Sequence, residues 1–172
     1  VASGPSAVPF LMHPQQGPMA RDVADLALFT DAMVGENSMV GLTKPRPTQS
    51  FRSAAGQPSR PTRVAFSADL GVTETSAEVT EICTRAMAAL ESDHIAVVAD
   101  QPDLSEASLT FEVARGLFYA TTLGPDLPQI RDVLKPELVW NIEYGLGLDA
   151  DTIRESIGAQ GRLFQHMVDF MT

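Results

Sequence analysis

The sequence predicts an α/β fold that is mostly helical and contains few strands. Two short apolar runs, at residues 63–67 and 94–99, have the length and composition of strands. They flank an amphipathic segment, which gives the strand–helix–strand order of a β-α-β unit. Helical periodicity continues on both sides of this unit, and the 172 residues, 44% of them apolar, suffice for one domain with a core.

The first third of the chain is expected to hold one helix between two proline-rich segments. Residues 1–18 contain four prolines, which exclude a regular helix. A helix is expected from residue 19 to about 34, with Gly35 as its stop, and its wide apolar surface predicts that it is mostly buried. Residues 36–62 are expected to form a long loop with basic but no acidic side chains after Glu36. We interpret it as a solvated loop, with a patch for an anionic ligand as the alternative.

Residues 63–172 are expected to begin with the strand–helix–strand unit and to continue with helices. Thr75 and Glu78 match a capping box at the start of the central helix. The apolar stripe that follows places Cys83 on the core face, where a buried thiol is favoured over a reactive one. Further helices are expected at 103–123, around 130–134, at 136–144, and from 149 or 151 to about 171.

Composition and charge bear on partners and compartment. The formal net charge of −10 argues against a nucleic-acid partner, which requires clustered Lys and Arg. The chain has no apolar run of about 18 residues and no signal-peptide pattern, so no membrane partner is expected. Cys83 is the single cysteine, which fits a reducing compartment. These features predict a cytoplasmic location.

The familiar catalytic and metal-binding patterns are missing from the sequence. It contains no Gly-x-Ser-x-Gly turn and no glycine-rich phosphate loop. The three histidines, His13, His94 and His166, are scattered and lack a metal-ligand spacing. Acidic pairs at 22 and 25 and at 149 and 151 lie where helices are expected to start, which favours an interaction with the helix dipole over catalysis. We therefore predict no metal and no cofactor.

The segment Gly-Pro-Met-Ala-Arg-Asp-Val-Ala-Asp-Leu-Ala-Leu at residues 17–28 resembles the amidase signature family of serine hydrolases. The similarity continues in the same order at residues 63–71, 77–90 and 162–170. It implies that residues 1–172 are a single segment of an amidase signature domain, whose fold is a mixed central sheet covered by helices. Within it, residues 1–35 would be a loop plus a buried helix.

The resemblance also implies a chemistry. The family hydrolyses amide bonds with a serine nucleophile, a second serine in a cis peptide and a lysine base, all placed before the Gly-Pro-Met-Ala-Arg motif. This chain starts without Met, after that region, and Lys44 and Lys135 follow the motif instead of preceding it. It is therefore expected to be an internal portion of an amidase that carries no catalytic residue and is inactive alone, while the complete enzyme acts on a small-molecule amide.

What carries over from the family is supporting structure. Gly17 and Pro18 form the turn into the helix, and Met19, Arg21 and Asp25 are further members of the motif. We expect Arg21 and Asp25 to make buried or half-buried hydrogen bonds, because a charge on a buried helix must be paired. Two further residues are candidates for the rim of a substrate pocket, with ordinary solvent-facing glutamines as the alternative: Gln15 and Gln16.

A second hypothesis gives the chain a different function. It would be a non-catalytic remnant or interaction domain derived from an amidase, and it would bind a partner through surfaces that the rest of an amidase normally covers. Two strands are too few for a stable sheet of their own, so one helix face would then be apolar and exposed. A homodimer, or association with the missing part of the fold, is the expected form of such binding.

Overall fold

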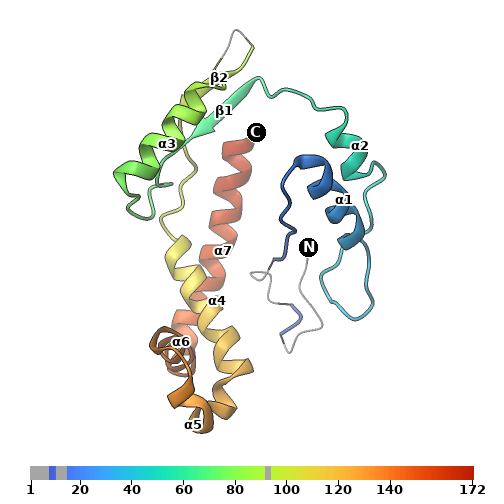
Figure 1. Ribbon diagram of the computed structural model, residues 1–172. Coiled ribbons are helices and arrows are strands. Elements are labelled where there is room, and N and C mark those ends of the chain that lie inside the picture. The colour runs from blue at the N-terminus through green and yellow to red at the C-terminus, as the bar shows by residue number, and fades with distance from the viewer. Residues whose placement is uncertain (1–7, 11–14, 92–93) are drawn as a thin grey trace. The chain divides into compact units, whose positions relative to one another are not determined.

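The computed structural model describes residues 8–10, 15–91 and 94–172 (Figure 1). The chain divides into two compact units, each made of two stretches of sequence. The first unit comprises Val1–Ser59 and Ala114–Gly147, and the second comprises Arg60–Val113 and Leu148–Thr172. Each unit is described by itself.

The second unit contains the predicted β-α-β element. Strands β1 (Arg63–Phe66) and β2 (Ala96–Ala99) pair in parallel, with Val64 opposite Val97 and Phe66 opposite Ala99. Helix α3 (Ala77–Ala88) connects them, as a parallel pair requires a crossover. The α/β class and the two strand positions are therefore confirmed.

The start of α3 differs from the predicted capping box by one residue. The Ser76 hydroxyl, not that of Thr75, accepts the N–H of Val79, at 3.4 Å. Thr75 instead donates its hydroxyl to the carbonyl of Ala68, 3.0 Å away, and so ties the helix start to the preceding loop. A hydroxyl does cap the helix as expected, but the predicted box of Thr75 and Glu78 is wrong, because the adjacent Ser76 is the capping residue.

The prediction that Cys83 lies on a core face is wrong. Its side chain is exposed, and α3 contains no buried residue. The apolar side chains do share one helix face, but no described element covers that face closely enough to bury it. Periodicity identifies a face and leaves its partner undetermined.

Two long helices complete the helical part of the second unit. Helix α7 (Ala150–Met171) matches the predicted last helix, and Asp149 caps it by accepting the N–H of Thr152 at 2.7 Å. Helix α4 (Ala107–Thr122) begins four residues later than expected, and its first turns belong to the second unit. The buried side chains of this unit include Val113, Ser156 and Ala159.

The helical part of the first unit is a close crossing of two helices. The later part of α4 is followed by three short turns: η1 (Gly124–Asp126), α5 (Leu127–Ile130) and η2 (Arg131–Val133). Helix α6 (Pro136–Leu146) then returns, and Ile142 on it is completely buried. Gly116 and Gly145 allow the two backbones to touch, because a Cβ added at Gly145 would lie 2.0 Å from the carbonyl oxygen of Gly116.

The remaining part of the first unit corrects two expectations. Helix α1 (Val23–Met33) has one buried residue, Ala27, so it is not the mostly buried helix that its composition predicts. A short helix, α2 (Phe51–Ala55), interrupts the predicted loop at residues 36–62 and packs against α1. Both carboxylate oxygens of Asp31 accept N–H groups from the first turn of α2.

Hydropathy along the helices adds one further observation. Within the described residues, no helix combines the length and the apolar composition that crossing a bilayer demands.

Candidate functional site

The motif segment at residues 17–28 begins as an extended lead and continues into α1. Asp22 adopts an extended conformation as the N-cap, and its carboxylate accepts the N–H of Asp25 at 2.9 Å. An acid at a helix start was expected for its interaction with the dipole. Gly17, Pro18 and Met19 precede the helix, and the Met19 side chain is 93% exposed.

The predicted paired charges of the motif are not buried. Arg21 and Asp25 are both exposed, whereas we expected buried or half-buried hydrogen bonds. The physical reason is that α1 buries only Ala27, so neither charge is removed from water and neither requires a partner. Gln15 and Gln16 are also exposed. Gln15 and Gln16 do not line the hollow at the end of α1 or the hollow at the carboxyl ends of β1 and β2. That they lie on a pocket rim stays a prediction.

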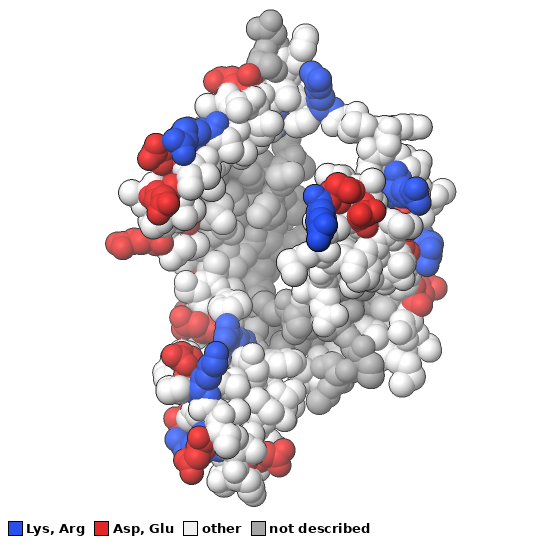
Figure 2. Space-filling view, in the orientation of Figure 1, with Lys and Arg blue, Asp and Glu red and all other residues white. Residues whose placement is uncertain are grey.

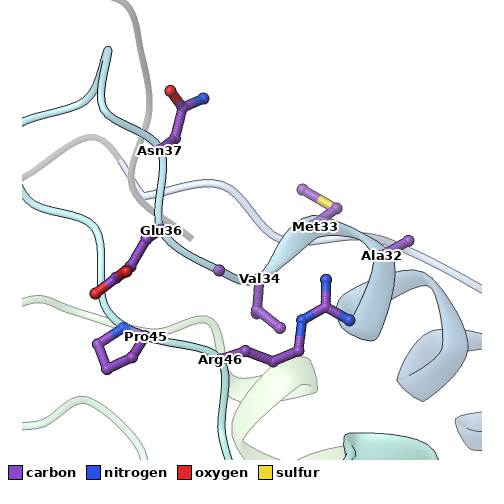
Figure 3. A pocket seen from close by; sticks show the side chains of 8 residues that line it. Ala32, Met33, Val34, Glu36, Asn37, Pro45 and Arg46 are labelled. Carbon is purple, nitrogen blue, oxygen red and sulfur yellow. The ribbon is translucent and has the colours of Figure 1, made fainter.

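The first hollow lies where α1 ends (Figure 3). It has a volume of about 510 Å³ and is lined by residues 32–37, Pro45 and Arg46. Gly35, with φ of +140°, makes the turn out of the helix. In Figure 3 the guanidinium of Arg46 extends toward the last turn of α1, and the carboxylate of Glu36 points the other way. Helix α1 has no basic residue in its last turn, and a helix C-terminus favours a nearby cation, which is the charge that Arg46 carries.

The second hollow lies at the carboxyl ends of β1 and β2. Its volume is about 490 Å³. Three lining residues follow or end β1 and three follow or end β2: Phe66, Ser67, Ala68, Ala99, Asp100 and Gln101. Ser67 is central to the polar part, because its hydroxyl accepts the N–H of Leu70 at 3.0 Å and donates to Gln101 Oε1.

The loop after β1 turns sharply to form one side of this hollow. Leu70 has a φ of +55° and Gly71 a φ of +68°, so two consecutive residues occupy the left-handed region. This conformation is unfavourable for leucine and persists where surrounding hydrogen bonds fix it. Asp69 supplies one of them, since its Oδ1 accepts the N–H of Gly71 at 2.8 Å.

An ion-pair network joins α7 to the segment before α4 in the second unit. Arg162 donates two hydrogen bonds to the carboxylate of Glu106, at 2.8 and 2.5 Å, across 56 residues of sequence. This guanidinium lowers the pKa of Glu106, and the carboxylate raises the pKa of Arg162. The His166 Nδ1 lies 3.0 Å from the carbonyl oxygen of Asp103. Hydrogen bonds from Ser105 lower the pKa of the Asp103 carboxyl. Both acids are therefore held in their charged form, which suits a bracing role.

The remaining chemically reactive groups do not assemble into a site. Across residues 8–10, 15–91 and 94–172, no three His, Cys, Asp or Glu side chains come together as metal ligands would. His13 lies outside the described residues. Lys44 and Lys135 are exposed, the first in the segment between α1 and α2 and the second at the cap of α6.

Sequence reasoning missed both the polar group around Ser67 and the Arg162 network. The signal for Ser67 was available, because polar residues directly after two parallel strands meet at one edge of a sheet. No sequence pattern indicated the pairing of Arg162 with Glu106, which depends on where α7 lies relative to the start of α4.

Comparison with known proteins identifies the family. A family model described as Amidase matches residues 9–122. A protein named acylamidase, from Rhodococcus erythropolis, is 37% identical over 75 residues. That alignment covers 44% of this chain and 16% of the relative, so the chain spans a small part of the relative's length. No solved structure matches. Because the family model covers more than half of the chain, the chain belongs to the amidase family.

Proposed function

We propose that this chain is the scaffold portion of a cytoplasmic enzyme that hydrolyses the amide bond of a small molecule. The proposal places the serine nucleophile, the cis-peptide serine and the lysine base on polypeptide that precedes these residues. The family match and the relative named acylamidase support the amide chemistry. In this mechanism the lysine acts through the bridging serine to deprotonate the nucleophile, and backbone N–H groups hold the oxyanion.

The observation that carries the scaffold role is the amount of large apolar side chain left exposed. On α7, Phe164 is 71% and Met171 73% exposed, and α3 leaves Ile82 51% exposed. On α1, Val23 and Phe29 are exposed as well. Exposed large apolar side chains in such number on a helix are typical of surfaces that other polypeptide covers. Further polypeptide of the same amidase would cover it.

The test is whether this chain has activity by itself. The purified 172-residue chain is incubated with a serine-directed fluorophosphonate probe and, separately, with a panel of small primary amides while released ammonia is measured. We expect neither labelling nor ammonia release, whereas a complete member of the family, run in parallel, gives both. Labelling of any serine in this chain would overturn the assignment of the catalytic residues to preceding polypeptide.

The same exposed faces favour a second candidate, a non-catalytic interaction domain. In that case the chain associates with itself or with a protein partner, and its function needs no upstream serine or lysine. Sedimentation velocity over a hundredfold range of concentration tests the homodimer. Concentration-dependent association supports this candidate, and a monomer that restores amide hydrolysis when mixed with the preceding part of an amidase argues for the enzyme scaffold.

A further inference from the structure

We propose that the hollow at the carboxyl ends of β1 and β2 binds a primary amine, with the ammonium group at Asp100, Ser67 and Gln101 and an apolar tail along Phe66. In parallel sheets, ligands bind outside the carboxyl ends of the strands. The hollow of about 490 Å³ is built by residues at that edge. The site lies within the second unit, and its binding does not depend on the proposed hydrolysis.

The pairing of the strands brings the polar residues together. Phe66 lies opposite Ala99 in the register, and the N–H of Asp100 donates to the carbonyl of Phe66 at 3.3 Å. This bond extends the β-ladder by one residue and places Ser67 beside Gln101. The side chains of these two residues are hydrogen-bonded to each other. The half-buried Phe66 and the small side chains of the two flanking alanines leave room for an apolar group.

The polar part of the hollow is rich in hydrogen-bond acceptors. The Ser67 hydroxyl donates its hydrogen to Gln101 Oε1 and accepts the N–H of Leu70. Each of these two side-chain oxygens keeps one lone pair that can accept a further hydrogen bond. Asp100 accepts the N–H of Gln101 through Oδ1, and its Oδ2 lies 3.5 Å from Arg63, which is long for a hydrogen bond. The same hollow is thus lined by three residues with acceptor oxygens, and an ammonium group has three N–H donors to offer them.

The charge around the hollow selects a cation over an anion. Among the described residues that line the hollow, Asp100 is the one charged side chain. Figure 2 shows acidic and basic side chains together over α3, where Arg85 pairs with Glu81 at 3.2 Å. Glu81 and Glu106 are each paired with an arginine, so the charge that acts in the hollow is the Asp100 carboxylate, which attracts an ammonium and repels a carboxylate.

The test is a titration of the isotopically labelled chain followed by amide NMR signals at neutral pH. The probe is benzylamine, and the comparison probes are benzyl alcohol and benzoate, which keep the aromatic ring and replace the ammonium group with a neutral hydroxyl or a carboxylate. Saturable shifts are expected at residues 66–71 and 99–101 with benzylamine, and binding at least about tenfold weaker with benzoate. Equal binding of benzylamine and benzoate, or shifts confined to other residues, would refute the proposal.

Three variants sharpen the result because they are expected to move affinity in different directions. Asp100→Asn should weaken benzylamine binding about fivefold, the effect of one exposed ion pair. Arg63→Gln should strengthen it, because Asp100 then loses its competing cation. Asp126→Asn in the first unit removes the same charge elsewhere and should leave the affinity unchanged. If the Asp100 and Arg63 variants both bind benzylamine as the unaltered chain does, the amine site is wrong.

Discussion

The crossing of α4 and α6 leaves no space for a side chain at Gly145. A Cβ there would lie 2.0 Å from the carbonyl oxygen of Gly116, although carbon–oxygen contacts of this type require about 3.3 Å. Gly145→Ala therefore forces the helices apart by roughly 1 Å, next to the fully buried Ile142. Overpacking of this kind costs about 1–3 kcal/mol, and the better helix propensity of alanine returns about 1 kcal/mol. Since the obstacle is backbone that cannot rotate away, the upper end of this cost applies, and we expect a net loss of about 2 kcal/mol.

The assay is urea unfolding followed by fluorescence of Trp140, the only tryptophan of the chain. Trp140 lies on α6 and stacks on Tyr144 with ring centroids 5.2 Å apart, so it reports on this crossing. The matched control is Gly147→Ala, because Gly147 has an ordinary φ of −89° and its Cβ would meet no atom closer than 3.4 Å. We expect the control to unfold within about 0.5 kcal/mol of the unaltered chain. Unchanged or increased stability of Gly145→Ala would show that the backbones do not touch here.

Three further predictions concern a buried hydroxyl, a long-range cap and an ion pair. Ser156 is 1% exposed and its Oγ has no hydrogen-bond partner among the described residues, so Ser156→Ala should raise the free energy of unfolding by about 1 kcal/mol; a loss in urea unfolding would contradict this. Asp31→Ala removes the acceptors for two N–H groups of α2, at 2.8 and 3.0 Å, and should speed their hydrogen exchange, with a cost of about 1 kcal/mol. The pKa of Glu106 is lowered by Arg162, so its stabilisation is complete above its ordinary pKa of about 4.3 and is lost as the pH falls through the lowered value. Arg162→Gln should therefore flatten the fall in melting temperature between about pH 5 and pH 3, and an unchanged slope would count against the pair.

Local signals predicted those parts of the fold that local physics determines. The strand positions followed from short apolar runs, and the parallel pairing followed from the crossover helix between them. The last helix was expected to start near residue 149 or 151, and the structure selects the first of these, because the Asp149 carboxylate caps α7. At α1 the start was expected at residue 19, which is four residues too early, because Asp22 caps a helix that begins at Val23.

The features that sequence reasoning missed depend on residues far apart in the chain. The five-residue α2 is too short to show a period, and its first turn is capped by Asp31, twenty residues earlier. The contact of Gly116 with Gly145 exists only once two helices cross. Within the candidate site, Ser67 and Gln101 are 34 residues apart and meet through the strand register. The family motif, in contrast, was recognisable because its residues are consecutive.

Hydrophobic periodicity predicted burial poorly, and the errors in α1 and α7 are of the same kind. Helix α1 buries Ala27 and exposes Phe29, and α7 buries Ser156 and Ala159 while exposing Phe164. Large apolar residues are ordinarily the ones inside, so these helices invert the usual distribution.

This inversion has an energetic consequence. Burying a large apolar side chain contributes about 1.5–3 kcal/mol, and a buried alanine or serine contributes far less. Within their own units these helices therefore pack through faces that carry small side chains. The faces that carry large apolar side chains remain exposed and available for packing. A surface that covers Phe164 and Met171 on α7 would add stability that the chain does not obtain from its own core. We accordingly expect polypeptide that completes an amidase domain to raise the melting temperature of this chain when mixed with it, and a partner that leaves these side chains exposed to have no such effect.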